Sequence, residues 1–332
     1  MTATPVSTFS VLIPAYQAAA FVGHAIESAL AQDPPPLEVI VCDDGSTDAT
    51  LAVLEGYRPS ITVLAKPNGG EASARNALFR AAQGDFVVYL DADDIYLPGR
   101  LAALHELITR DPAIDLATTD AFMVLDGEIV GRRYEGEQVF ALTDQRKAII
   151  RANFIFGHAA VRRSLLHELG GFDESILYAT DWEMWVRVIL GGGRAALVPE
   201  PLAEYRLHAS AMSVQRLRMS DGRISTLGKT LKRGDLDDAE REIIETALAR
   251  ERVRNERELF FAGLRTRSTG PRQRAWRVAR NTAQPRRTRL LAALGAVSPR
   301  AAGLAFGRRD KHVVWGPGDR PIPHASAPRS RA

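Results

Sequence analysis

The chain has 332 residues, which is long for one average domain and fits a core domain of about 200–250 residues with an appendage. Hydrophobic residues make up 45% of the sequence and charged residues 25%, as in ordinary globular proteins, and the formal net charge of only +3 argues against a dedicated nucleic-acid binder. The single cysteine, Cys42, excludes a disulfide framework and a cysteine-based zinc cluster, and it favours a reducing setting.

No targeting segment and no membrane span are expected from the sequence. Residues 1–8 carry neither a basic segment nor a long apolar run, so no signal peptide is predicted. The best candidate for a membrane span, Leu290–Phe306, is interrupted by Pro299 and Arg300. We therefore expect a cytoplasmic protein.

Short apolar runs alternate with helical patterns over the first hundred residues, in the order β-α-β-α-β-α-β. This order predicts a mostly parallel sheet with helices on both faces. The predicted strands are 9–13, 37–42, 61–65 and 85–90, and the predicted helices are 21–31, 72–83, one capped by Asp48 and one that begins at Pro98.

The alternation changes after Asp111. Asp126-Gly127 is a hairpin signal between predicted strands 115–125 and 128–134, and Thr180 is a predicted N-cap of a helix that ends at Leu190. Further helices are predicted at 145–153, 164–169, 217–232 and 235–264, further short strands at 157–161, 195–198 and 202–206, and the sequence beyond Ser268 is Arg-rich without a clear period.

The near-neutral total charge is the sum of two opposite parts. Residues 1–215 hold 16 basic and 28 acidic residues, a net charge of −12. Residues 216–332 hold 27 basic and 12 acidic residues, a net charge of +15. This shift predicts a boundary near residue 215 between an acidic domain and a basic appendage.

Two acidic clusters follow predicted strands. Asp43 and Asp44 lie in the segment 41–48, and the segment 90–94 reads Leu-Asp-Ala-Asp-Asp. Ligands of open parallel sheets bind at the carboxyl ends of strands, and three carboxylates in four residues repel one another unless a cation such as Mg²⁺ or Mn²⁺ compensates. The alternatives are a turn with a helix cap for the first cluster and a solvated acidic turn for the second.

Three further clusters admit two interpretations each. A glycine pair and Arg75 either approach a phosphate or carboxylate ligand or form a helix entry with an internal ion pair. Asp181, beside two tryptophans, is either a partly desolvated general base or an acid that caps a helix. His208 is either a metal ligand or an ordinary surface or core histidine, and the other histidines, His158 among them, show no ligand spacing.

The order and spacing of these clusters resemble the family 2 glycosyltransferases of the GT-A fold. The resemblance covers roughly residues 8–213. It implies an α/β fold, a Rossmann-like, mostly parallel sheet flanked by helices. The helical pattern and the basic charge beyond residue 215 add a helical basic extension at the C-terminal end. The motifs that carry it are the segments 10–16, 41–48, 68–76, 90–94, 170–174, 180–183 and 205–208.

The resemblance assigns the nucleotide side of a site. It implies that Asp44 binds the nucleobase with Asp43 close by, and that Arg75 approaches the nucleotide or diphosphate. Asp91, the first acid of a DxD motif, is implied to face the ribose. The residues implied to line the nucleotide pocket after the first strand are Pro14, Ala15 and Tyr16.

The resemblance also assigns a metal site and a base. Asp93 and Asp91 are implied to hold Mg²⁺ or Mn²⁺, and His208 is implied to complete the metal site. Asp181 is implied to be the catalytic base. Thr180 departs from the family, which often has Glu at this position, so the contacts to the acceptor are expected to differ.

The implied activity is an inverting transfer of a sugar from a UDP-, dTDP- or GDP-sugar to a hydroxyl of a glycan or lipid-linked acceptor, as in cell-surface polysaccharide or glycolipid synthesis. A nucleotidyltransferase would instead need a Gly-rich loop after the first strand, where the sequence has Pro14-Ala15-Tyr16. A catalytically inactive nucleotide-sugar-binding or scaffold protein is the other alternative, and the intact acids Asp91 and Asp181 argue against it.

Four segments are predicted on this basis: a nucleotide-sugar-binding half 1–110, an acceptor-binding half 111–215, a helical extension 216–268 and a basic tail 269–332. Three roles stay open for the tail. It docks on the anionic inner face of the plasma membrane through its arginines and Trp276, it clamps the acidic domain, or it is partly disordered. Nucleic acid is not expected as a partner, because no interleaving of aromatic and basic residues is present.

Overall fold

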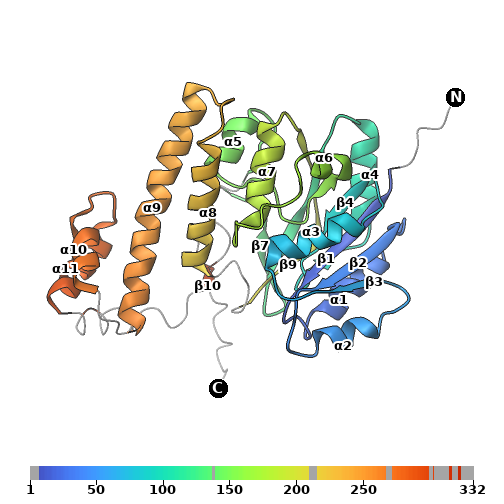
Figure 1. The fold of residues 1–332 in the computed structure, drawn as a ribbon, viewed down its shortest axis with the longest axis horizontal. Coiled ribbons are helices and arrows are strands. Elements are labelled where there is room, and N and C mark those ends of the chain that lie inside the picture. Colours follow the sequence, from blue (N-terminus) through green and yellow to red (C-terminus); the bar gives the residue numbers. More distant parts are fainter. Residues whose placement is uncertain are drawn as a thin grey trace, which may run out of the picture. The chain divides into compact units, whose positions relative to one another are not determined.

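The structure is a computed structural model that describes residues 7–136, 139–208, 215–266 and 271–298, together with Ala302, Val314–Trp315 and Pro321–Ile322. The chain divides into two compact units, whose ribbons are drawn in Figure 1. Unit 1 comprises Met1–His208 and Asp237–Ile243, and unit 2 comprises Ala209–Leu236 and Ile244–Ala332. The finer boundaries at residues 110 and 268 stay predictions.

Unit 1 is built on a sheet whose strands, within the described ranges, follow the order β3-β2-β1-β4-β8-β6-β9-β5, with β7 paired to β6. The first four strands of this order are parallel, β8 is antiparallel to both neighbours, and β6 and β9 are parallel again. The predicted α/β architecture is therefore confirmed. The strands are β1 Phe9–Ala15, β2 Glu38–Asp43, β3 Thr62–Ala65, β4 Phe86–Tyr89, β5 Ile95–Tyr96, β6 Leu116–Leu125, β7 Glu128–Arg132, β8 Ala160–Arg162 and β9 Ala195–Leu207.

The alternating side chains of β1 explain the layers around the sheet. Phe9, Val11 and Ile13 belong to one buried cluster together with side chains of three helices on that face, α1 Val22–Leu30, α2 Thr50–Glu55 and α4 Arg100–Arg110. Leu12, which is fully buried, points to the opposite face, where α3 Glu71–Ala81 packs on β1 and β2 (Figure 1). Because both faces are covered, the strand has a continuous apolar sequence.

Three expectations about the ends of elements are wrong. Thr180 is not an N-cap: Ala179, with a φ of 56°, precedes α7 Thr180–Leu190, and Thr180 is the first helical residue. Pro98 does not begin a helix, because α4 starts after Gly99, whose φ is 84°. Residues 195–207 form one irregular strand, β9, instead of two short strands, and its pairing with β6 shifts register near Asp120.

The hairpin between β6 and β7 is confirmed. Asp126 and Gly127 have φ values of 53° and 84°, as a type I′ turn requires. Two short helices, α5 Gln145–Arg151 and α6 Arg163–Glu168, complete the helices of unit 1 before α7.

Unit 2 is mostly helical in its described part. α8 Arg216–Thr230 and α9 Asp238–Thr266, whose first residues belong to unit 1, agree with the predicted helices. Part of the predicted basic tail is also helical, with α10 Pro271–Arg280 and α11 Arg286–Val297 packed around Phe260 and small side chains such as Ala292. Short strands β10 Val314–Trp315 and β11 Pro321–Ile322 pair with each other, and no described helix combines the length and the apolar composition that a membrane span needs.

A capping box fixes the start of α9. Glu240 N–H donates to Asp237 Oδ1 over 2.6 Å, and Asp237 N–H donates to Glu240 Oε2 over 3.1 Å. Arg146 of α5 donates to both Glu240 oxygens, over 2.7 and 3.0 Å. This hydrogen bond with Arg146 holds the pKa of the Glu240 carboxyl below its usual value.

Replacement of Glu240 by Gln is expected to lower the free energy of unfolding by about 1–2 kcal/mol near neutral pH, because it removes the charge-assisted bonds to the partly exposed Arg146. The pKa of Glu240 is lower in the folded than in the unfolded chain. The stabilisation is therefore present above the unfolded pKa and is lost as the pH falls through the folded pKa. Urea denaturation across this pH range measures both effects.

The matched control for this substitution is Glu55→Gln, which breaks an exposed pair with Arg58. Its effect is expected to stay below about 0.5 kcal/mol. Equal stability of E240Q and the wild type at neutral pH would contradict the role of the Arg146–Glu240 pair.

Candidate active site

The carboxyl ends of β1, β2 and β4 lie at one edge of the sheet, because these strands are parallel neighbours. Pro14 and Ala15 end β1, and Tyr16 follows with 54% of its surface exposed. The next residue, Gln17, joins the loops after β1 and β2, since its Oε1 accepts from Thr47 N–H over 2.9 Å. The residues predicted to line a nucleotide pocket therefore lie at the sheet edge where open parallel sheets generally bind ligands.

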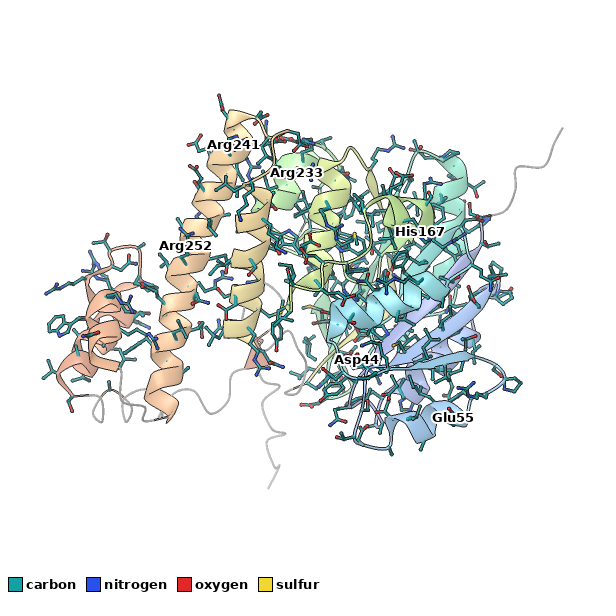
Figure 2. All side chains as sticks on the ribbon, viewed as in Figure 1. Asp44, Glu55, His167, Arg233, Arg241 and Arg252 are labelled. Carbon is teal, nitrogen blue, oxygen red and sulfur yellow. The ribbon has the colours of Figure 1, made fainter. Side chains whose placement is uncertain are left out.

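Asp44, labelled in Figure 2, follows β2. Its carboxylate is buried and is held by the loop after β3. The ammonium group of Lys66 pairs with Oδ1. Gly69 N–H donates to Oδ1 over 3.0 Å and Gly70 N–H donates to Oδ2 over 2.8 Å. Asp44 thus fixes the glycine pair against β2, beside the buried Asp43.

The guanidinium group of Arg75, on α3, is buried, with 2% of the side chain exposed. Its centre lies 5.4 Å from the ring centre of Tyr89 and 5.5 Å from that of Phe172. Its Nη2 is 2.8 Å from Glu71 Oε1 and 3.1 Å from Asp91 Oδ1. The internal ion pair considered for Arg75 is therefore present, and it includes the first acid of the DxD motif.

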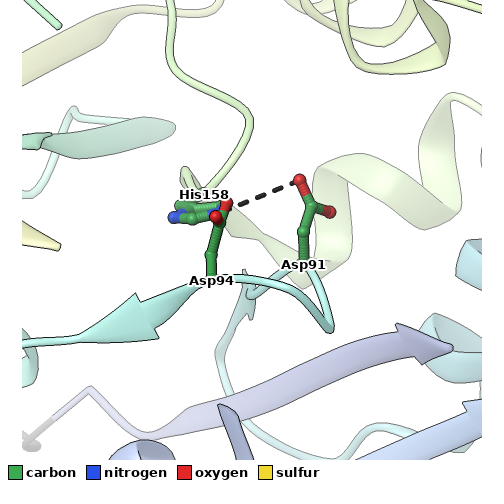
Figure 3. Close-up of side chains that lie close together, drawn as sticks. All are labelled: Asp91, Asp94 and His158. Carbon is green, nitrogen blue, oxygen red and sulfur yellow. Dashed lines mark ion pairs between the residues drawn. The ribbon is translucent and has the colours of Figure 1, made fainter. Parts of the chain in front are cut away.

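The turn after β4 brings Asp91 and Asp94 to His158 (Figure 3). His158 Nε2 is 2.8 Å from Asp94 Oδ2 and 3.7 Å from Asp91 Oδ2. Asp94 and His158 are buried, whereas the Asp91 side chain is 32% exposed. The antiparallel register of β4 and β8, with Val88 opposite Ala160, explains the contact, because it places residue 158 beside residue 90.

Burial and mutual contact set the charges of this triad. Burial raises the pKa of Asp94 to about 7, against the charge of His158. Burial also opposes ionisation of Asp91, but the contact with His158 and the charge of Arg75 outweigh it and hold the pKa of Asp91 below its usual range. The triad offers three ligand atoms within 4.8 Å of one another, an arrangement that fits a divalent ion.

A second, more exposed pair of acid and histidine joins Asp93 of the same turn to His208, which follows β9. Asp93 Oδ2 is 2.8 Å from His208 Nε2, and the two side chains are 32% and 23% exposed. The hydrogen bond to Asp93 raises the pKa of His208, whose ring stacks on Phe21 with centroids 5.0 Å apart. Just before His208, Arg206 N–H donates to Asp94 Oδ1 over 2.7 Å, so the end of β9 is joined to the acidic turn.

Asp181 is the second residue of α7. Its Oδ1 accepts from Trp182 N–H over 2.7 Å, and its Oδ2 accepts from Asn153 Nδ2 over 3.0 Å. The hydroxyl of the preceding Thr180 accepts from Arg75 Nη1 over 3.1 Å. Arg75 therefore connects the first turn of α7 with the acidic turn after β4.

The segment 170–174 packs on α3 through Asn76. Asn76 Oδ1 accepts from Phe172 N–H over 2.7 Å, and Asn76 Nδ2 donates to Phe172 O over 2.9 Å. Gly171 has a φ of 80°, and a Cβ at this residue would lie 2.5 Å from Asn76 Oδ1. A residue without a side chain is required here, and the segment sets the path of the chain toward α7 and Asp181.

Residues 10–170 match the family model described as glycosyl transferase family 2. This part of the chain is a family 2 glycosyltransferase domain. The matched range holds the Asp44 loop, Arg75 and the acidic turn, while Asp181 and His208 follow it.

The similar curated proteins include polysaccharide synthases. Chondroitin synthase of Pasteurella multocida (strain Pm70) is 34% identical over 184 residues, which are 54% of this chain and 18% of the synthase. The succinoglycan biosynthesis protein ExoO of Rhizobium meliloti (strain 1021) is 32% identical over 221 residues, which are 63% of each protein. The match therefore covers less than two thirds of the length of these relatives.

Solved structures share the fold. TarS 1–349 of S. aureus superposes with a TM-score of 0.59 and 18% identity, covering 95% of this chain and 99% of TarS 1–349. The mannosyltransferase PcManGT of Pyrobaculum calidifontis gives a TM-score of 0.55 with 20% identity, covering 93% of this chain and 89% of that protein. The GT-A fold predicted for this family 2 glycosyltransferase is confirmed.

The glycosyltransferase brings several of the predicted site residues into contact. Arg75 contacts Asp91, and Asp93 contacts His208. Asp91 itself lies against Arg75 and His158, so its ligand role stays a prediction, as do the roles of the other site residues. The side chains that sequence reasoning did not assign are Glu71, Lys66, Asn153 and His158, and only strand register could have indicated His158.

Replacement of His158 by Asn is expected to lower the free energy of unfolding of the glycosyltransferase by about 2–4 kcal/mol, because the buried Asp94 carboxyl loses its charged partner. Adding Asp94→Asn is expected to recover part of the loss, since the double variant has no unpaired buried carboxylate. Urea denaturation of the two single variants and the double variant measures the coupling.

The control is His167→Asn at an exposed histidine that touches Phe79, which is expected to change stability by less than about 1 kcal/mol. Losses that simply add in the H158N/D94N variant would contradict the coupling between the two side chains.

Proposed function

We propose that this protein is an inverting glycosyltransferase that moves a sugar from a nucleoside-diphosphate donor to an acceptor hydroxyl. The observation that carries the proposal is the buried Arg75, which contacts the DxD acid Asp91 and also Thr180, the neighbour of Asp181. An acidic turn suited to a metal and a donor, and a carboxylate suited to act as a base, are thus joined through one side chain. Membership of family 2 supports the reaction class.

A divalent ion, Mg²⁺ or Mn²⁺, fits the turn after β4. The turn offers carboxylate and imidazole ligands, and Asp91, Asp94 and His158 present three ligand atoms within 4.8 Å of one another. The residues that would hold the ion are Asp91, Asp93 and His208, which are partly exposed, with Asp94 and His158 as the alternative set. When bound, the ion stabilises the charge that develops on the leaving diphosphate.

The protein's own side chains supply binding and proton transfer. Asp44 and Asp43 hold the nucleobase edge of the donor, with Pro14, Ala15 and Tyr16 lining the nucleotide. Asp181 accepts the proton of the acceptor hydroxyl while the hydroxyl oxygen bonds to the anomeric carbon and the bond to the diphosphate breaks. A single displacement of this kind inverts the anomeric carbon.

Asn153 orients the base. Its amide donates to Asp181 Oδ2 over 3.0 Å, while Trp182 N–H holds Oδ1 at the N-terminus of α7. Both carboxylate oxygens therefore have a fixed direction, and each retains a lone pair for the acceptor hydroxyl. A carboxylate held in this way is ready to accept a proton without a conformational change.

The donor and acceptor classes are suggested by the similar proteins. TarS 1–349 has been crystallised with UDP and with UDP-GlcNAc, and PcManGT with GDP-Man and Mn²⁺, which supports a UDP-, dTDP- or GDP-sugar as donor here. Chondroitin and hyaluronan synthases among the relatives support a glycan or lipid-linked acceptor in cell-surface polysaccharide or glycolipid synthesis. The alternative is a catalytically inactive nucleotide-sugar-binding or scaffold protein.

Incubation of the full chain with UDP-, dTDP- and GDP-sugars and Mn²⁺ is expected to release nucleoside diphosphate from one donor class, and EDTA is expected to stop the release. Asp181→Asn is expected to lower kcat at least about 100-fold, because an amide cannot accept the proton. Asp126→Asn, at an exposed hairpin position with a φ of 53° that Asn also adopts, is the control and is expected to leave kcat unchanged.

Two outcomes would contradict the proposal. Binding of a nucleotide sugar without any turnover in the wild type would favour the inactive scaffold. Turnover of D181N at the wild-type rate would show that Asp181 is not the base.

We also propose that the α10–α11 hairpin, residues 271–297, docks on an anionic membrane surface. Leu290, Leu294 and Val297 follow one another at helical spacing on α11 and are 72%, 40% and 70% exposed. Trp276 on α10 is 46% exposed, and the guanidinium of Arg280 lies 5.3 Å from its ring centre. An apolar stripe beside arginines is typical of helices that lie in a membrane interface.

The basic charge of this region favours anionic lipid as the partner. Exposed arginines flank the stripe at 277, 280, 286 and 287, and residues 216–332 carry a net charge of +15. A further arginine of unit 2, Arg252 of α9, is labelled in Figure 2. Each arginine close to a phosphatidylserine surface contributes about 1 kcal/mol of attraction.

The full chain is expected to sediment with vesicles that contain about 30% phosphatidylserine and to stay in solution with pure phosphatidylcholine. The variant Leu290→Ser with Leu294→Ser is expected to lower the bound fraction at least about threefold, because apolar side chains no longer enter the interface. Leu142→Ser, at a leucine of unit 1 that is 79% exposed, is the control. Unchanged binding of the double variant, or equal binding to neutral vesicles, would contradict the proposal.

A further inference from the structure

Glu71 connects the start of α3 with the first turn of α7. It is the first residue of α3, directly after Gly70, and its side chain is 18% exposed. One carboxylate oxygen, Oε1, is 2.8 Å from Arg75 Nη2. The other, Oε2, accepts the hydroxyl hydrogen of Thr180 over 2.8 Å, although the two residues are 109 positions apart in the chain.

These contacts form a closed ring of three side chains. The Thr180 hydroxyl accepts from Arg75 Nη1 and donates to Glu71, and the same guanidinium is bound to Glu71 through Nη2. Arg75 Nη2 also reaches Asp91 Oδ1 at 3.1 Å. Thr180 uses its only donor and one acceptor position inside the ring, so its hydroxyl is fixed in direction.

From this ring we infer that Glu71 is a positioning residue for the transfer step: through Thr180 it fixes the first turn of α7, and with it the base Asp181, relative to Asp91 and the donor. The inference rests on the proposed function and extends it to a residue that touches neither donor nor acceptor. At position 180, directly before the base, the family often has Glu, whereas this chain has Thr180. Here Glu71 of α3 supplies a carboxylate in contact with that position.

The physical reason lies in the distribution of charge. Arg75 is buried and is shared between Glu71 and Asp91, so loss of the Glu71 charge leaves Asp91 as its remaining carboxylate partner among the contacts described above. Thr180 then loses a charged acceptor, and the N-terminus of α7 is held by one bond fewer. A shift of about 1 Å in a reacting group lowers the rate about 100-fold, whereas donor binding depends on the turn after β4 and persists.

A comparison of Glu71→Gln with Glu240→Gln tests the inference. Glu240 is likewise a buried carboxylate paired with an arginine, Arg146, over 2.7 Å, but this pair lies at the start of α9. E71Q is expected to lower kcat about 10- to 100-fold with the donor KM changed less than about threefold. E240Q is expected to lower the melting temperature and to leave kcat within about threefold.

The variant Thr180→Val supplies the second measurement. It keeps the shape of the side chain and removes the hydroxyl, so it is expected to lower kcat by a factor similar to that of E71Q. The double variant E71Q/T180V is expected to be no slower than the slower single variant, because both changes break the same connection.

The outcomes separate this inference from the proposed function. Absence of turnover in the wild type contradicts the proposed function itself. If the wild type turns over, three results contradict the role of Glu71: an unchanged kcat for E71Q, an equal fall in kcat for E240Q, or rate losses that multiply in the double variant. A fall in kcat for E71Q alone, with the donor KM preserved, supports it.

Discussion

The buried guanidinium group of Arg75 is the constraint on which the arrangement of unit 1 depends. A cation with 2% of its side chain exposed is unfavourable unless carboxylates compensate its charge, and Glu71 and Asp91 do so from two different segments. Burial acts to lower the pKa of Arg75, but these carboxylates outweigh it and raise the pKa, so the group stays charged. The rings of Tyr89 and Phe172 close the remaining sides.

This single charge explains why several acids can lie so close together. The pKa of Asp91, beside Arg75, lies below its usual range, whereas burial raises the pKa of Asp94 beside His158. The acids of the turn after β4 thus have two different partners: Asp91 pairs with Arg75 of α3, and Asp94 pairs with His158, which precedes β8. Arg75 and His158 are both distant in sequence from the acids with which they pair. The sheet brings the elements that carry them together.

The parts of the fold that could be predicted from sequence are those that depend on local pattern. The apolar run around Leu12 and the turn signal of Asp126-Gly127 are local, so the strands and the hairpin were predicted correctly. Spacing along the chain does not indicate His158, because its contact with Asp94 arises from the register of β4 with β8. The local pattern favours Thr180 as a cap, whereas its hydrogen-bond partners are 105 and 109 residues away in the chain.

The basic region illustrates a different reason for failure. The core between α9, α10 and α11 is formed by alanines around Phe260, and small residues give a weak periodic signal in a sequence dominated by arginine. Of the large apolar residues of α11, Leu290 and Leu294 are exposed, whereas Leu291 packs against the core. Large apolar residues thus lie on both sides of the helix, and periodicity alone does not mark its core face.

The antiparallel pairing of β8 with β4 has a consequence for the tolerance of the chain to length changes. Side chains alternate between the faces of a strand, so a shift of one residue between Val88 and Ala160 would turn His158 away from Asp94 and leave a buried acid alone. Insertions or deletions between residues 158 and 160 are therefore incompatible with the site. In the exposed hairpin at Asp126-Gly127 the same change would alter only a surface turn. Strand register therefore fixes the length of the segment that leads into β8, whereas the length of the exposed hairpin can change.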